Sequence, residues 1–150
     1  MDDFVKAFVK ASVAWLAVGV VLGMAMAIVP EWTVYRAMHV HVMLVGFVTM
    51  FINGVGYHVV PRLSGRPLWS IPAARKHWWI ANAGLCMMVA GFWLRARGNP
   101  AATGVLSAGG LVTAVSAIIF VLQVWLTVDA PPPVESVRRA APLPMAPRAQ

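Results

Sequence analysis

Histidine, a side chain well suited to bind metal, recurs in one apolar segment of this sequence. Residues 36–67 contain His39, His41 and His58, three of the chain's four histidines. No Asp, Glu, Lys or Arg lies between Arg36 and Pro61. Neutral imidazole is the commonest metal ligand among side chains and also binds haem iron. Because ionisable groups at membrane depth are costly and usually functional, we expect a metal or haem site among these histidines.

Helical spacing limits what His39 and His41 can bind. At about 100° per residue, His39 shares a stripe with Met43 and with Gly46, two turns further along. A glycine there would leave room for a flat ring against the helix. His41 points about 160° away from His39, so one iron cannot easily take both. We predict that His39 binds the metal or haem, and that His41 meets a neighbouring helix, a second metal or a partner chain.

The alternative for both histidines is a hydrogen-bonded role without any ligand. A single histidine in a soluble core would usually be of that kind. Here His39 and His41 lie two residues apart at a membrane interface, on a helix that carries a glycine stripe. The pattern favours a metal or haem at His39 and leaves the two roles of His41 open.

Arginines at the level of His39 could hold the carboxylates of a haem. Arg36 precedes His39 by one helical turn, and Arg95 and Arg97 lie in a turn expected at the same end of the bundle. Guanidinium groups pair well with carboxylates. We expect Arg36 to contact a haem propionate. The alternative is that these side chains extend to the lipid headgroups, as arginines at helix ends commonly do.

A second site is less clearly marked. His58 and His77 fall at the other end of their helices and could form a bis-histidine site, although two separate interfacial histidines are the interpretation that we favour. Methionine sulfur could supply a second axial ligand, but methionine more often fills packing space. The methionines at suitable places are Met24, Met26, Met87 and Met88. Cys86, the single cysteine, excludes an intrachain disulfide and is most simply a small buried residue.

Composition places these residues in a membrane. The sequence of 150 residues is 60% hydrophobic and 11% charged, against roughly 45–50% and 25% in soluble domains. Its apolar runs predict spanning helices at about 11–29, 36–60, 77–94 and 101–128. Pro61 is expected to end the second helix. Short connections predict an all-α, up-down-up-down bundle over residues 1–128, and a Pro/Ala/Arg-rich tail, 129–150, is expected to be disordered.

The signs and places of the charges predict orientation. Nine basic residues belong to the N-terminus, the loop at 62–76 and the tail, against three on the other side. The positive-inside rule then places both termini in the cytoplasm, across a bacterial-type inner membrane.

The net charge of +7 does not indicate nucleic-acid binding, because the basic residues flank apolar runs. No acidic residue lies within an expected span, so no buried carboxylate is available as a general base.

Glycines mark the expected helix contacts. Small residues let helix backbones approach closely in a membrane. The candidates are Gly19 and Gly23 in the first span, Gly84 and Gly91 in the third, and Gly104, Gly109 and Gly110 in the fourth.

The second span resembles a helix of the haem-copper oxidase superfamily, in the branch of cbb3-type oxidases and nitric oxide reductases. The resemblance lies in Arg36-Ala-Met-His39, then Gly46-Phe47, then Tyr57-His58-Val-Val-Pro61. The forms HVHVMLVGF and YHVVPRLSGRPL are similar to those of short stand-alone proteins that resemble oxidase subunit I. In the family, the histidine that matches His39 is an axial ligand of low-spin haem b. The resemblance therefore implies haem b at His39, with propionates facing outward.

Three hypotheses follow from the resemblance. The first is a small membrane haem-b protein that transfers electrons or binds a diatomic gas such as nitric oxide or dioxygen. The second is a subunit of a multi-chain oxidase or nitric oxide reductase. The third is a structural membrane protein without cofactor. The family's copper-binding histidines have no match here, so we expect no catalysis by this chain alone. A homo-oligomer, other membrane subunits or a redox partner would complete the system.

Overall fold

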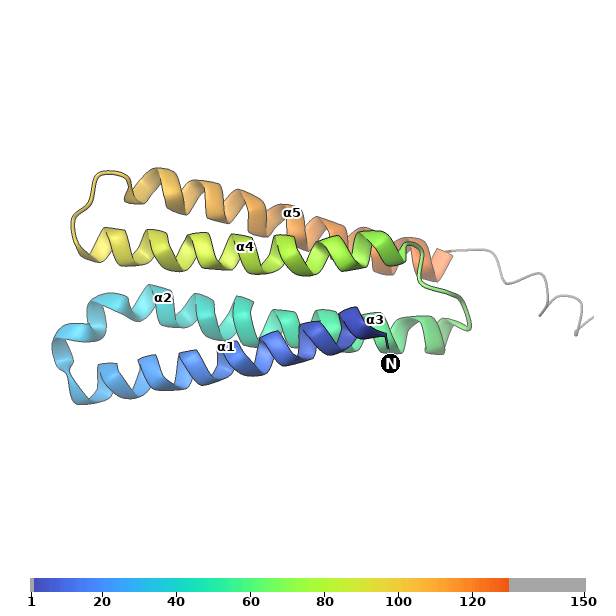
Figure 1. The fold of residues 1–150 in the computed structure, drawn as a ribbon, viewed down its shortest axis with the longest axis horizontal. Helices are drawn as coiled ribbons and strands as arrows, with labels where there is room; N and C mark the ends of the chain where they lie inside the picture. The colour runs from blue at the N-terminus through green and yellow to red at the C-terminus, as the bar shows by residue number, and fades with distance from the viewer. Residues whose placement is uncertain (1, 130–150) are drawn as a thin grey trace, which may run out of the picture.

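Four antiparallel helical spans form the fold. The structure, a computed structural model, describes residues 2–129. Helix α1 (Asp3–Ile28) leads to a span that runs from Pro30 to Ser64, and helices α4 (Ile71–Ala96) and α5 (Ala102–Asp129) follow. The chain reverses direction at each connection (Figure 1). The expected tail, 129–150, lies outside the described residues apart from Asp129, the last residue of α5.

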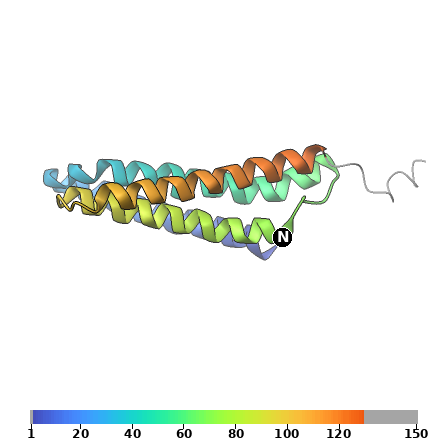
Figure 2. The same cartoon turned by 90° about the horizontal axis from the view of Figure 1, so that it is seen from above.

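Each span is long and apolar enough to cross a bilayer, with 26, 35, 26 and 28 residues. A bilayer core about 30 Å thick needs about 20 such residues. In Figures 1 and 2, seen at right angles, the four spans form a two-by-two bundle. Helix α1 lies beside the second span, α4 and α5 pack closely on each other, and α3 (Met50–Ser64), the last part of the second span, also contacts α5. The predicted all-α membrane bundle is confirmed.

The second span is not one regular helix. It begins with a 3-10 segment, η1 (Pro30–Tyr35), and continues through α2 (Arg36–His41), a π-helical segment η2 (Val42–Thr49) and α3. A π segment hydrogen-bonds from residue i to i+5 and turns less per residue than an α-helix. The 100° spacing used to place side chains on one stripe therefore does not hold between His41 and Met50.

Pro61 does not end the second span, contrary to expectation. It lies inside α3, which continues to Ser64. A proline costs the helix one hydrogen bond, but the following turn can still form. The helix ends instead at Gly65, whose φ of 65° is left-handed, a conformation that glycine adopts without a Cβ clash.

The next span also begins earlier than expected. Helix α4 starts at Ile71, so His77 lies nearly two turns inside it and does not open it. The Ser70 hydroxyl accepts a hydrogen bond from the Ala73 amide and caps the helix. Pro72 in the first turn suits this position because its missing N–H would have no partner there.

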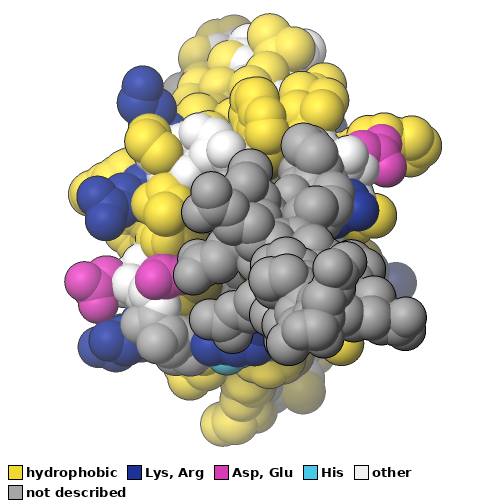
Figure 3. Space-filling model, turned by 90° about the vertical axis from the view of Figure 1, so that its right-hand side faces the viewer, with side chains coloured by type: hydrophobic (Ala, Val, Ile, Leu, Met, Phe, Trp, Pro, Cys, Tyr) yellow, Lys and Arg dark blue, Asp and Glu magenta, His cyan; other side chains and the backbone are white. Residues whose placement is uncertain are grey.

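Aromatic packing fills the bundle near the end that carries the N-terminus. Phe4 and Phe8 of α1 pack on Tyr57 of α3 with ring centroids 5.8 and 5.7 Å apart, and Phe120 of α5 lies 5.3 Å from the same ring. Figure 3 looks onto this end, where Lys, Arg and acidic side chains are visible around hydrophobic ones. The packed core therefore lies toward one membrane face.

The connection between α3 and α4 is held by polar side chains of α5. Gln123 is 1% exposed; its amide nitrogen donates to the Ser70 carbonyl, and its oxygen accepts from the Ser70 amide. Thr127 accepts a hydrogen bond from the Trp69 amide, and Arg66 donates to the Val128 carbonyl. Buried polar side chains of α5 thus fix the start of α4.

Replacing Gln123 by methionine should destabilise the bundle by about 1–3 kcal/mol, because the Ser70 amide would lose its partner and the Ser70 carbonyl would keep only the Ala74 amide. Thermal unfolding followed by circular dichroism in detergent measures the change. Leu122→Met places the same side chain one residue away on a half-exposed position and should leave the transition almost unmoved. Equal effects of both variants would contradict the role given to Gln123.

Candidate functional site

The His39 ring lies against helix α1. Its Nδ1 is 3.0 Å from the carbonyl oxygen of Gly19. Gly23, one turn further along α1, faces the same ring, since a Cβ at this glycine would lie 3.0 Å from His39 Cε1. The two glycines of α1 therefore let the second span approach, and the imidazole occupies the space that a side chain at Gly23 would fill.

This hydrogen bond decides which nitrogen of His39 can act as a ligand. A carbonyl oxygen only accepts, so Nδ1 carries the proton and Nε2 of the neutral ring keeps its lone pair. Within residues 2–129, Nε2 has no hydrogen-bond partner. Metal-binding histidines commonly donate their other N–H to a backbone carbonyl, which fixes the ring and its tautomer. The chemistry of His39 thus fits an axial ligand.

His41 meets a different helix. Its Nδ1 lies 2.8 Å from the Ala37 carbonyl of its own helix, and its ring packs on Phe92 of α4 with centroids 4.8 Å apart. The two histidines therefore diverge, His39 toward α1 and His41 toward α4, as the spacing predicted. The structure does not bring them together around one ion.

The space beside Gly46 is filled. A Cβ at this position would lie 2.8 Å from Leu85 Cδ2 of α4 and 2.9 Å from Trp15 Cβ of α1. The indole nitrogen of Trp15 also donates to the Asn82 side chain of α4. Gly46 thus lies where three spans meet, and the room expected there for a flat ring is taken by these side chains.

The arginines near this end differ in their surroundings. Arg36 is exposed, one turn before His39 in α2, and no carboxylate pairs with it among residues 2–129. The Arg97 guanidinium lies 4.3 Å from the centre of the Trp93 ring, an arrangement that stabilises its charge without an anion. Arg36 is therefore better placed than Arg97 for a propionate.

His77 has a different role from the one expected. It is fully buried, with Nδ1 2.7 Å from the Tyr57 hydroxyl and Nε2 2.8 Å from the Ser116 hydroxyl. Both ring nitrogens are thus engaged, and His77 is neither interfacial nor paired with His58. His58 instead lines a surface hollow at the N-terminal end of the bundle. The bis-histidine alternative is not formed in the structure.

The Tyr57–His77–Ser116 cluster was not predicted as a unit. Tyr57 belongs to the segment that resembles the oxidase helix, whereas Ser116 lies in an otherwise apolar run of the fourth span. A hydroxyl or amide inside a span is itself a signal, because such groups hydrogen-bond across helices in a membrane. By that signal Ser116 and Gln123 would have marked the inward side of α5.

No group of three or more His, Cys, Asp or Glu side chains that could hold a metal ion occurs within residues 2–129. That finding concerns only ions held by three or more such side chains, and a haem iron needs only one or two protein ligands. Of the candidate methionines, Met88 has its sulfur 3.5 Å from the Thr113 hydroxyl, and Met24 is 59% exposed. Cys86 is exposed, contrary to expectation.

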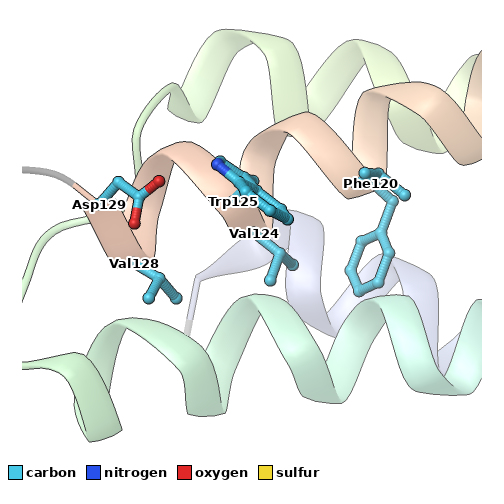
Figure 4. Close-up of a pocket in the computed structure, with 6 residues that line it drawn as sticks. Phe120, Val124, Trp125, Val128 and Asp129 are labelled. Atoms are coloured by element: carbon cyan, nitrogen blue, oxygen red, sulfur yellow. The ribbon is translucent and has the colours of Figure 1, made fainter.

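The hollows offer little chemistry near His39. An apolar hollow of about 390 Å³ runs along α5, where Phe120, Val124, Trp125 and Val128 line it and Asp129 lies at its end (Figure 4). A second hollow of about 460 Å³ lies on α1 beside Trp32 and Met38 and has no polar lining. Such surfaces suit lipid acyl chains better than a charged ligand.

Fold and site together define a multi-pass membrane protein whose second span carries a histidine, His39, hydrogen-bonded through Nδ1 to a backbone carbonyl of α1. The family described as Cytochrome C and Quinol oxidase polypeptide I matches residues 3–139, and the chain belongs to this family. The resemblance to haem-copper oxidase subunit I is thereby confirmed.

A relative in this family is the Cbb3-type cytochrome c oxidase subunit CcoN1 of Stutzerimonas stutzeri. It is 30% identical over 99 residues, which cover 62% of this chain and 21% of that protein. The chain therefore spans about a fifth of the length of the relative that it matches. What the relative does as a whole belongs to a much longer sequence.

Proposed function

We propose that this chain binds haem b, with His39 Nε2 as an axial ligand of the iron. The observation that carries the proposal is the 3.0 Å contact between His39 Nδ1 and the Gly19 carbonyl. This contact places the proton on Nδ1 and leaves the lone pair of Nε2 free to bind iron. Family membership supports the choice of haem over a bare metal ion. A bound haem would supply reversible one-electron chemistry and a position for a diatomic gas.

The other parts of the proposal concern residues near His39 and the orientation of the chain. Arg36 is proposed to contact a propionate at the same end of the bundle, with the propionates facing outward. Both termini are proposed to lie in the cytoplasm of a bacterial-type inner membrane. Gly46, packed between Trp15 and Leu85, is proposed as a helix-contact position, and His41 as a residue that joins α2 to α4. The membrane domain is proposed to comprise residues 1–128, followed by a tail.

These helices alone leave no room for a haem beside Gly46, because Trp15 and Leu85 fill that space. We propose that a second copy of the chain or another membrane subunit closes the site and supplies any second ligand. The protein would then transfer electrons to a redox partner or bind nitric oxide or dioxygen. A second candidate function, as a subunit of a multi-chain oxidase or nitric oxide reductase, is favoured by the short match to its much longer relative.

A pyridine haemochrome assay on the purified full chain tests the proposal. We expect a haem b spectrum and a Soret band that shifts when dithionite is added. About one haem per chain would indicate a complete site in each copy, and about one per two chains a shared site. Carbon monoxide binding to the reduced protein would indicate an open coordination position. A colourless preparation with full helicity after growth with added haem would contradict haem binding.

A further inference from the structure

A hollow of about 230 Å³ lies well inside the membrane part of the bundle, lined by residues of the second span, α4 and α5. Two of these residues, Asn53 and Thr113, are about three helical turns or more from either end of their spans. The walls are mostly apolar, and no Asp, Glu, Lys or Arg among residues 2–129 lines them. Thr49 of the second span and Ala117 of α5 are the exposed members of the lining. The hollow therefore opens sideways, past these two residues, into the lipid.

Asn53 brings an unpartnered amide to this hollow. The residue is 3% exposed, and its side chain makes no hydrogen bond within residues 2–129. In that part of the chain, Trp78 Nε1 is the polar side-chain atom that is both sealed off and without a partner. The Asn53 amide is therefore unpartnered but not sealed off, and the open space that it touches is the hollow that it lines. An amide without a partner at this depth costs free energy, so a ligand that pairs with it would be stabilised.

The other polar side chains of the lining are already engaged. The hydroxyls of Thr49 and Thr113 donate to backbone carbonyls of their own spans. The Ser116 hydroxyl lies 2.8 Å from His77 Nε2. Asn53 is thus the polar side chain of the lining that has both donors and an acceptor free, because an amide offers two N–H groups and one carbonyl oxygen. It can receive a ligand hydroxyl or carbonyl, whereas a charged ligand would find no counter-ion at a depth where charge is costly.

The size of the hollow limits the ligand further. An apolar cavity of about 150 Å³ holds a benzene molecule, so about 230 Å³ accommodates one six-membered ring with a polar substituent. A longer apolar tail would have to leave past Thr49 and Ala117. A lipid acyl chain would fill the apolar part but leave the Asn53 amide unpaired. Water would pair with the amide but would lie against mostly apolar walls.

We propose that this hollow binds an uncharged, lipid-soluble molecule built on a single ring. A hydroxyl or carbonyl group of the ligand hydrogen-bonds to the Asn53 amide, and its apolar tail leaves past Thr49 and Ala117 into the bilayer. The ligand enters from the lipid and needs no path to water. The site is separate from His39, whose ring lies against α1, so it does not depend on haem binding.

Two probes that differ by one hydroxyl test the proposal. Full-length protein with ¹⁵N-labelled asparagine and ¹³C-methyl methionine is placed in lipid bilayers, and 4-butylphenol or butylbenzene is added at equal mole fraction in the lipid. The methyl of Met50, which lines the hollow, reports by NMR whether either ring is bound, and Met50→Leu assigns its signal. The side-chain amide of Asn53, one of three asparagines, reports the hydrogen bond. We expect the phenol to shift both signals and to bind about tenfold more tightly than butylbenzene, which is about 1.4 kcal/mol and the size of one hydrogen bond.

Matched variants separate the polar contact from the apolar walls. Asn53→Leu has a side chain of similar size without an amide, so it should bind the two probes equally, with the affinity for the phenol reduced about tenfold. Ala117→Phe should block the opening to both probes, whereas Ala114→Phe places the same side chain at an exposed position of α5 outside the lining and should leave binding unchanged.

Three results would overturn the proposal. Equal affinity of the wild-type protein for both probes would make the hollow a groove for acyl chains. Magnetisation transfer from water to the Asn53 amide that the phenol does not displace would make it a water site. An unmoved Met50 methyl with both probes would mean that no ring binds there.

Discussion

Replacing His39 by phenylalanine is expected to remove the haem. Phenylalanine keeps a flat ring against Gly23, where the imidazole now lies close to α1, but it has no nitrogen to bind iron. If His39 Nε2 is the axial ligand, the Soret band and the pyridine haemochrome signal should fall to background. Circular dichroism should show unchanged helicity, because the other contacts of the second span remain.

His41→Phe is the matched control. It places the same side chain two residues away on the same helix, and the ring packed on Phe92 is preserved. This variant should keep its full haem content. The reverse pattern, with haem lost from His41→Phe and kept in His39→Phe, would transfer the ligand role to the histidine that faces α4. Full haem in both variants would contradict ligation by this helix.

Hydropathy was sufficient to predict the fold because a bilayer restricts the possible structures. Backbone groups in lipid must be satisfied within the chain, so long apolar runs become helices. Local irregularities follow from other forces. The π segment Val42–Thr49 packs on α1 and α4, and a rule applied to one helix at a time does not include such contacts. The turn of helix after Pro61 is exposed, with Leu63 82% exposed, and its Ser64 hydroxyl donates to the Val60 carbonyl.

For the candidate site too, the sequence predicted local helix geometry but not the contacts between spans. Helical spacing correctly predicted that His39 and His41 diverge, because both lie in the regular segment α2. The role of Gly46 depends on Trp15 and Leu85, which come from two other spans. His77 was assigned to an interface because the start of α4 was placed six residues too late. Contacts between distant residues decide what the sequence pattern leaves open.

Leucine substitutions at the adjacent residues Gly109 and Gly110 should have opposite effects on the stability of the bundle. A Cβ at Gly109 would lie 2.7 Å from the backbone nitrogen of Met88, whereas nothing lies within 4 Å of one at Gly110. Backbone cannot move aside as the end of a flexible side chain can. Gly109→Leu should therefore force α4 and α5 apart and cost about 3 kcal/mol or more.

Gly110→Leu is the matched control and should keep or slightly raise stability, because leucine favours helix more than glycine by roughly 1 kcal/mol. Reversible unfolding in mixed detergent, followed by circular dichroism, measures both variants. The sequence gives these neighbours equal standing as contact residues, and the structure separates them by about 100° around α5. Equal destabilisation by both leucines would mean that Gly110 also faces a helix, in this chain or in a partner. Tolerance at both positions would contradict the close approach of α4 and α5, on which the α4–α5 hairpin depends.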